Sequence, residues 1–197
     1  MTRTQVAIPQ VSTDAAVPAV EIRPARMDDE QRVRSFVEEL SLRSRTLRFF
    51  AGLTRPNRRL VSALIATDDR RDVLLAVDGD DRVIGHAMSF KRDGATEIAV
   101  VVADEWQGVG LGSRLVRVLL RRAAARGAVS VGMDVMGENR KVLSIIKRWW
   151  PDAEMRVESG TVEVLAPIGA LLGNPDQITS FGMRFGNVRD PFGGEGR

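Results

Sequence analysis

The stretch of residues 96–127, "TEIAVVVADEWQGVGLGSRLVRVLLRRAAARG", contains three glycines at alternate positions, Gly108, Gly110 and Gly112. They separate an apolar run from a basic amphipathic segment. Because glycine has no Cβ atom, the backbone N–H groups of such a turn can approach a large anion. A helix that starts at the turn adds the positive end of its dipole. The stretch therefore predicts a site for a phosphate-rich ligand.

Two common phosphate-binding loops do not fit this spacing. The Walker loop needs Lys followed by Ser or Thr after its last glycine, whereas Ser113 and Arg114 stand here. The dinucleotide fingerprint G-x-G-x-x-G would need glycine in place of Ser113 or Leu115. The residues spell Q-x-x-G-x-G instead, from Gln107 to Gly112.

Apolar periodicity predicts the elements that hold this turn in place. We expect a short strand before Pro24, a helix capped by Asp28 and a second helix over residues 56–66. Period-two runs separated by turns predict antiparallel strands at 72–78, 82–90 and 96–103. After the helix that follows the turn, we expect a strand in "AVSVGMDV", a helix in "ENRKVLSIIKRWW" and a hairpin in "AEMRVESGTVEVLAP". Helices would then flank a mixed sheet in an α/β arrangement.

The composition indicates one domain with loose ends. With 197 residues, of which 44% are hydrophobic, the chain has the composition of an ordinary soluble fold. Residues 1–20 are polar and aperiodic, which predicts a disordered arm. The glycine-rich residues 169–197 predict a tail. The domain between them spans residues 21–168.

Several classes of protein are disfavoured by composition and pattern. The chain has no cysteine, which excludes a disulfide framework and a thiolate metal site, and we expect no bound metal. No apolar run is long enough for a signal peptide or a membrane span, so we expect a cytoplasmic protein without a membrane partner. The net charge of +3 suits a polyanionic ligand as well as nucleic acid. Because no stacking aromatics lie in basic strands, we expect no nucleic-acid partner.

The pattern Q-x-x-G-x-G between a strand and a helix resembles motif A, [RQ]-x-x-G-x-[GA], of the GNAT superfamily of acetyl-CoA-dependent N-acyltransferases. The order of elements through "ENRKVLSII" is also similar, and the resemblance covers residues 21–168. It implies an α/β (α+β) fold with a mixed, mostly antiparallel sheet, flanked by helices and splayed at its central strands. The segments "SLRSRTLRFF", "EIAVVVADEWQGVGLGSRL" and "DVMGENRKVL" resemble the acetyltransferase domain of bacterial protein lysine acetyltransferases.

This resemblance implies acetyl-CoA as cosubstrate and a primary amine as acceptor, with a protein lysine as the first candidate. Small polyamines, aminoglycosides and protein N-termini stay open as acceptors, and so do a monomer and a homodimer. The coenzyme is expected to contact the turn, the strand before it and the helices that follow, through Ala99, Val100, Val101, Val102, Gln107, Gly108, Val109, Gly110, Leu111, Gly112, Ser113, Arg114 and Asn139.

Glu97 is the expected general base. A lysine amine has a pKa near 10.4 and is mostly protonated at pH 7, so acyl transfer requires a base. Glu97 lies on the strand before the turn, on one face with Ala99 and Val101, among apolar residues that would remove part of its solvent. The acetyltransferases that this chain resembles carry a glutamate at this point of the strand, which implies that Glu97 deprotonates the amine, directly or through water. A second interpretation is a solvated carboxylate beside the "DGAT" turn.

The sequence departs from the family pattern in the motif B helix. Many members use a tyrosine there to protonate the leaving thiolate, but this chain has no tyrosine, and Ile146 takes the position. A thiol with a pKa near 8.5 can leave unassisted, or with a proton from Ser144 or water. "RWWPD" also replaces the usual "GF" pair. These differences keep open a catalytically weak acyl-CoA-binding regulatory domain of the same fold.

Other ionisable residues are weaker candidates for catalysis. His86 is the sole histidine and lies mid-strand in "VIGHAMS" without a carboxylate close in sequence, so we expect a structural role. If Glu97 is not the base, the acids Asp68, Asp69 and Asp72 ahead of the second sheet strand are the next group to consider.

Overall fold

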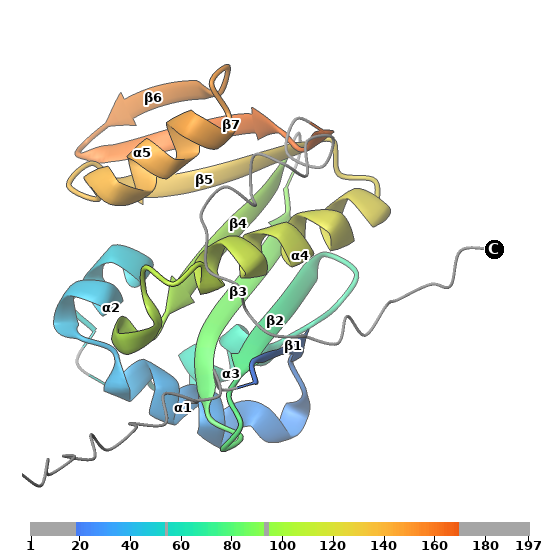
Figure 1. The fold of residues 1–197 in the computed structure, drawn as a ribbon, viewed down its shortest axis with the longest axis vertical. Helices are drawn as coiled ribbons and strands as arrows, with labels where there is room; N and C mark the ends of the chain where they lie inside the picture. Colours follow the sequence, from blue (N-terminus) through green and yellow to red (C-terminus); the bar gives the residue numbers. More distant parts are fainter. Residues whose placement is uncertain (1–18, 54, 93–94, 170–197) are drawn as a thin grey trace, which may run out of the picture.

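The described part of the chain forms a seven-stranded sheet with helices on both faces (Figure 1). The structure, a computed structural model, describes residues 19–53, 55–92 and 95–169. The strands are β1 Glu21–Pro24, β2 Arg71–Val77, β3 Val83–Lys91, β4 Thr96–Val102, β5 Ser130–Met136, β6 Glu154–Glu158 and β7 Thr161–Pro167. The helices are α1 Glu30–Glu39, α2 Leu42–Phe49, α3 Arg58–Ile65, α4 Leu111–Ala125 and α5 Arg140–Trp149, with 3₁₀ turns at Met27–Asp29 and Asp104–Trp106. The predicted arm and tail, 1–20 and 169–197, lie almost entirely outside the described residues.

The sheet has the strand order β1-β2-β3-β4-β5-β7-β6. Its strands pair antiparallel except for β4 and β5, which run parallel and are connected through α4. The predicted mixed, mostly antiparallel sheet flanked by helices is therefore confirmed.

The parallel pair at the centre of the sheet is short. β4 and β5 pair only at Thr96 with Val131 and at Glu97 with Gly132. Beyond these residues the two strands diverge, as the ribbon shows between the lower and upper halves of the sheet (Figure 1). From Ala99 onward, the edge of β4 that faces β5 has no strand partner among the described residues. The predicted splay is confirmed.

The two faces of the sheet carry different helices. A Cβ atom on Gly85 of β3 would lie 2.9 Å from Leu115 of α4, so odd-numbered residues of this part of β3 point toward α4. His86 points the other way and bonds the carbonyl of Leu64 in α3. We call these the α4 face and the α3 face. Because Val101 pairs with His86, the side chains of Val101, Ala99 and Glu97 lie on the α3 face.

The core is built from the apolar stripe of α4 and the apolar residues of the strands beneath it. Leu115, Leu119 and Leu120 are fully buried, and each contributes about 1.5–3 kcal/mol of transfer free energy. Trp150 is buried under α5, where its Nε1 donates to the carbonyl of Pro167. The tryptophan pair at the C-terminal end of α5, Trp149 and Trp150, therefore has at least one core member, as its aromatic character favours.

Two helix starts differ from the sequence prediction. Asp29 rather than Asp28 precedes α1, and its buried carboxylate accepts two bonds of 2.7 Å from the Arg23 guanidinium. The second predicted helix begins at Arg58 and not at Pro56, because the side chain of Asn57 caps it by accepting from the Leu60 N–H. The start of α1 is thus set by the buried ion pair of Asp29, and the start of α3 by the asparagine cap.

The sequence pattern missed α2. Ser41 caps this helix by accepting from the Ser44 N–H, which is an ordinary start signal. The side of α2 that packs against the body, however, carries the buried Ser44 rather than an apolar stripe, while Leu42 is exposed. Apolar periodicity cannot detect a helix whose packed face is polar.

No helix in the described ranges is both long enough and apolar enough to cross a membrane.

Candidate active site

The glycine turn leads directly into the N-terminus of α4. Gly108 and Gly110 have φ values of +85° and +90°, a region that other residues rarely adopt. Gly110 is the N-cap position of α4, and the first N–H groups of a helix have no partners within it. The turn therefore presents free donors at the positive end of the helix dipole, an arrangement that suits phosphate oxygens.

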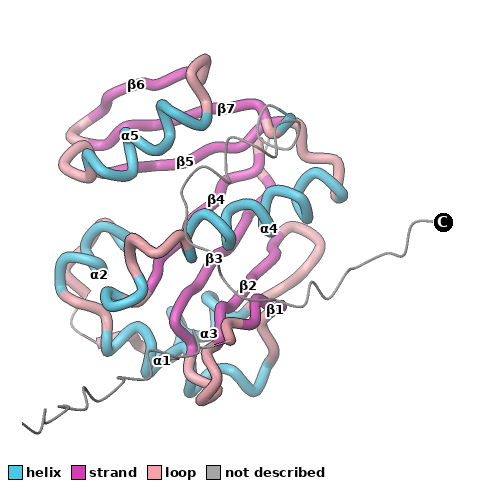
Figure 2. The backbone as a smooth tube through the Cα atoms, in the orientation of Figure 1, coloured by secondary structure: helices cyan, strands magenta, loops and turns pink. Residues whose placement is uncertain are grey.

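Close packing ties the turn to the end of β4. A Cβ atom on Gly112 would lie 3.7 Å from Val102, so the first turn of α4 lies against the strand. Gln107 donates at 3.1 Å to the Val102 carbonyl and at 3.1 Å to the Ser44 hydroxyl of α2. The side chain of Gln107 thus holds the turn, the strand and α2 together. Figure 2 shows α2 beside the loop between β4 and α4.

A second connection between α2 and the turn was not predicted. Asp104 accepts bonds from the Ser41 hydroxyl at 2.8 Å and from the Ser44 hydroxyl at 2.7 Å. These serines lie about 60 residues earlier in the chain, so no local pattern around Asp104 indicates the bonds. The sequence did contain one signal for this region: Ser41 and Ser44 are three positions apart, the spacing of a helix N-cap and the residue whose N–H it accepts from.

Most of the predicted coenzyme residues are brought together by the structure. Ala99, Val100, Val101 and Val102 line the free edge of β4, and Val109, Leu111, Ser113 and Arg114 belong to the turn and the first turn of α4. Leu111 is buried in the core, so only its backbone faces the turn. Partial burial lowers the pKa of Arg114 from its usual value, since desolvation disfavours the charged form.

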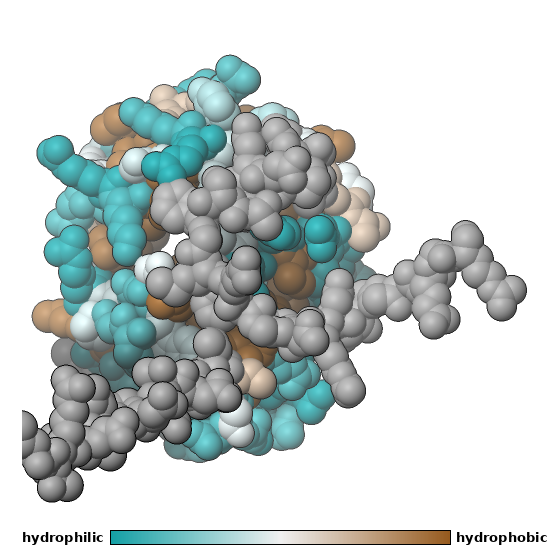
Figure 3. Space-filling model, in the orientation of Figure 1, coloured by the Kyte–Doolittle hydropathy of each residue, from teal (hydrophilic) through white to brown (hydrophobic). Residues whose placement is uncertain are grey.

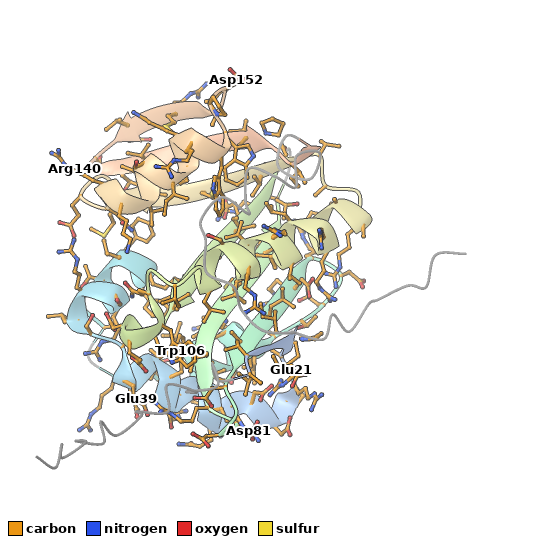
Figure 4. All side chains as sticks on the ribbon, in the orientation of Figure 1. Glu21, Glu39, Asp81, Trp106, Arg140 and Asp152 are labelled. Carbon is orange, nitrogen blue, oxygen red and sulfur yellow. The ribbon has the colours of Figure 1, made fainter. Side chains whose placement is uncertain are left out.

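Asn139 has a structural role in the described fold. Its side-chain oxygen accepts from the Val142 N–H at 3.3 Å and caps α5. The neighbouring Arg140 marks this end of α5 in Figure 4, on the side of the molecule where Trp106 marks the loop leading to α4. In Figure 3, hydrophilic residues cover much of the surface along this side.

Asn139→Ala is expected to lower the free energy of unfolding by about 1 kcal/mol, because it removes the helix cap. If Asn139 also contacts the coenzyme, this variant raises the apparent acetyl-CoA constant more than the acceptor constant. Asn139→Asp is the control, since it keeps the cap. Urea unfolding and steady-state kinetics measure the two effects. An equal rise of both constants would leave Asn139 with the capping role alone.

Glu97 lies at the mouth of a pocket on the α3 face. The pocket has a volume of about 340 Å³ and is lined by Arg92, Glu97, Gly132, Met133, Asp134, Glu154, Arg156, Glu163, Val164 and Leu165. A Cβ atom on Gly132 would lie 3.5 Å from the Glu97 Cγ, so this glycine leaves room for the glutamate. The Glu97 side chain is 37% exposed and pairs with Arg92 at 3.0 Å. The carboxylate is thus partly covered by protein and reachable from the pocket.

The alternative acids do not gather near this pocket. Asp72 belongs to β2 and is buried, where its carboxylate accepts from Arg122 of α4 at 2.6 Å and 3.0 Å. It pairs across the sheet with Ser89, so it lies on the α4 face, opposite Glu97. Asp68 closes a turn through the N–H groups of Arg70 and Arg71. No group of three or more acidic or histidine side chains in the described residues is placed to hold a metal ion.

His86 is buried in the core of the α3 face. Its Nε2 lies 2.8 Å from the Leu64 carbonyl, which fixes the proton on that nitrogen, and its Nδ1 has no partner among the described residues. Burial, together with the charge of Arg48, lowers the pKa of His86 to about 4. The imidazole is therefore neutral at pH 7.

The buried His86 predicts a pH dependence of stability. Its pKa is 6.5 in the unfolded chain and about 4 in the fold, so the unfolded state binds more protons between these values. The free energy of unfolding should fall as the pH decreases from 6.5 to 4. His86→Gln should make this decline shallower in denaturant titrations across that range. If the free energy of unfolding declines equally steeply in His86→Gln and in the wild type, the decline comes entirely from the carboxylates.

The arrangement of these groups defines a class of protein. A sheet split between two parallel strands places the glycine turn on the α4 face and the Glu97 carboxylate on the α3 face. A family model described as the acetyltransferase (GNAT) family matches residues 36–148. The chain belongs to this family.

Individual relatives agree with the family. An acetyltransferase of Pseudomonas aeruginosa is 32% identical over 112 residues, which cover 54% of this chain and 60% of that relative. The chain thus spans about 60% of the length of that relative. The GNAT domain of S. lividans PAT superposes with a TM-score of 0.68 at 25% identity, covering 75% of this chain and 90% of that one.

Two further structures share the fold at lower identity. A spermidine N-acetyltransferase from Vibrio cholerae, in complex with CoA and spermine, has a TM-score of 0.61 at 13% identity and covers 78% of this chain and 98% of its own. A phosphinothricin acetyltransferase from Sinorhizobium meliloti, in complex with AcCoA, has a TM-score of 0.58 at 16% identity, with coverages of 76% and 88%.

Proposed function

We propose that the protein transfers an acetyl group from acetyl-CoA to a primary amine, with a protein lysine as the acceptor and Glu97 as the general base. The observation that carries this proposal is the free edge of β4 between the glycine turn and Glu97. A thioester lying along this edge would have its phosphates at the turn and its reacting carbon near the pocket.

The coenzyme would be held mainly by backbone groups. Its pyrophosphate would accept from the N–H groups of residues 108–113, and its pantetheine arm would pair with the free edge of Ala99 to Val102. The same edge offers N–H donors to the carbonyl oxygen, where negative charge develops in the transition state. Relatives of this fold with bound CoA and AcCoA support acetyl-CoA as the cosubstrate.

Glu97 would prepare the acceptor for attack. Its carboxylate takes a proton from the ammonium group, and the free nitrogen then attacks the thioester carbon. The new C–N bond forms and the C–S bond breaks, and coenzyme A leaves as a thiolate that takes up, through water, the second proton lost by the attacking nitrogen. Since a thiolate is a tolerable leaving group, the absence of tyrosine does not prevent the reaction.

The charges of the pocket support a cationic acceptor. Glu97, Asp134, Glu154 and Glu163 contribute carboxylates, against the two arginines Arg92 and Arg156. A net negative lining attracts an ammonium group before its deprotonation. The 340 Å³ volume suits the end of a lysine side chain entering from the surface.

A thiol-release assay with acetyl-CoA and a panel of amines tests this proposal. The panel contains a lysine peptide, spermidine, an aminoglycoside and a peptide with a free N-terminus as its sole amine. We expect release to be fastest with the lysine peptide. Acetyl-CoA binding in calorimetry without release for any amine would instead support the second candidate function, a regulatory acyl-CoA-binding domain, which the absence of tyrosine favours.

A further inference from the structure

Arg48 is a partly buried cation whose guanidinium has two buried nitrogens without a hydrogen-bond partner among the described residues. Its Nε and Nη2 atoms are closed off from solvent and make no hydrogen bond within the described residues. No carboxylate of those residues lies within ion-pair distance of it. The guanidinium carbon lies 5.1 Å from the centre of the Phe49 ring, a contact that leaves the in-plane N–H groups unsatisfied.

This arrangement is costly in the unliganded fold. A charge removed from water without a counter-ion is unfavourable, and arginines with buried guanidinium nitrogens are normally paired. Desolvation lowers the pKa of Arg48 to about 10, so the group stays charged at pH 7. A charged group that the protein itself leaves uncompensated points to a counter-ion supplied from outside.

The position of Arg48 relates it to the acceptor rather than to the phosphates. Arg48 lies one turn after the buried Ser44 on α2, the helix that packs against β4. The charge of Arg48 contributes, after burial, to the lowered pKa of His86, whose side chain lies on the α3 face. Glu97 lies on this same face, whereas the N-terminus of α4 belongs to the other.

The packed side of α2 offers the guanidinium no counter-charge among the described residues. An apolar residue at position 48 would pack α2 against β4 without a desolvation cost. His86 is neutral, and the carboxylate of Asp104 is already engaged by the serines of α2. The local structure thus leaves the guanidinium without an acidic partner among the described residues.

We infer that Arg48 binds a carboxylate of the amine acceptor and selects acceptors that carry one. The inference rests on the proposed function. Val101, which pairs with His86, lies four residues beyond Glu97, about 13 Å along an extended strand. An acceptor that reaches both groups carries its carboxylate well separated from its amine, as in an acidic residue near a lysine or in a long amino acid.

Two pairs of acceptors separate these sources of the carboxylate. One pair is a lysine peptide flanked by glutamates and the same peptide flanked by glutamines. The other is free lysine and lysine methyl ester. The wild type should favour the carboxylate-bearing member of at least one pair by tenfold or more in kcat/KM. Arg48→Gln should remove that preference, while Arg43→Gln, an exposed arginine of the same helix, should keep it.

Three results would overturn the inference. One is a wild type that treats both members of both pairs within threefold. Another is an Arg48→Gln variant that loses activity equally with every acceptor and has a lower melting temperature. Removing an unpaired charge that serves binding should leave the melting temperature unchanged or raise it, so a lower value would indicate a structural role. A third is a preference for succinyl-CoA over acetyl-CoA that disappears in Arg48→Gln, which would place the carboxylate on the acyl group.

A binding measurement keeps the test independent of catalysis. Glutarate, a dicarboxylate without an amine, should raise the melting temperature of the wild type and of Arg43→Gln but not of Arg48→Gln. If glutarate binds in this way and no amine is acetylated, the carboxylate site stands and the proposed function fails. If glutarate shifts none of the three proteins and no amine reacts, both fail.

Discussion

Replacing Glu97 by glutamine should lower kcat by about 10² to 10⁴-fold, the usual contribution of a general base. The amide keeps the size of the side chain but cannot accept the proton from the acceptor ammonium. Acetyl-CoA affinity should stay within about twofold, because the coenzyme contacts the turn and the edge of β4. Stopped-flow thiol release and calorimetry measure the two quantities.

Glu163→Gln is the matched control for this prediction. Glu163 lines the same pocket, but it comes from β7 rather than from the strand that leads into the turn. The control should keep its kcat and raise only the KM of a cationic acceptor, because Glu163 contributes charge to the pocket but takes no proton. If Glu97→Gln keeps turnover within threefold at pH 7, the amine loses its proton elsewhere.

Gly110→Val should weaken acetyl-CoA binding by at least tenfold. Gly110 holds a φ of +90°, where a β-branched residue is strained by about 1–3 kcal/mol, so the turn must rearrange to accept valine. A rearranged turn no longer directs its N–H groups at the pyrophosphate. Calorimetric titration with acetyl-CoA measures the loss.

Gly79→Val serves as the control for the glycine turn. Gly79 lies between β2 and β3, has no heavy atom within 4 Å of an added Cβ and does not have a positive φ. The Gly79→Val variant should bind acetyl-CoA as tightly as the wild type does. Unchanged binding by Gly110→Val would move the pyrophosphate away from residues 108–113.

The sequence predicted the centre of the fold well. The alternating apolar residues of β4, the glycines and the leucine stripe of α4 each carry a local signal, and their order matched one family. The antiparallel strands before β4 were equally readable, because glycine-containing turns separate period-two runs. These elements are specified by residues close together in the chain.

The remainder depends on contacts between distant residues. The packed face of α2 is polar, so no periodicity revealed the helix or the isolation of Arg48. Asp72 was predicted as one of three acids ahead of the second sheet strand. In the fold it is buried and forms an ion pair with Arg122, fifty residues later in the chain. Long-range pairing of this kind leaves no local pattern in a single sequence. The sequence therefore predicted the candidate site residues of β4 and the glycine turn, but not the contacts made by α2.

Mass spectrometry of a lysine peptide incubated with acetyl-CoA and enzyme tests the central claim most directly. The wild type should convert the lysine to acetyl-lysine with release of one coenzyme A per peptide modified. Glu97→Gln should do so at least a hundredfold more slowly while still binding acetyl-CoA. Modification at equal rates by the wild type, Glu97→Gln and heat-denatured protein would contradict the account, because the acetylation would then be uncatalysed.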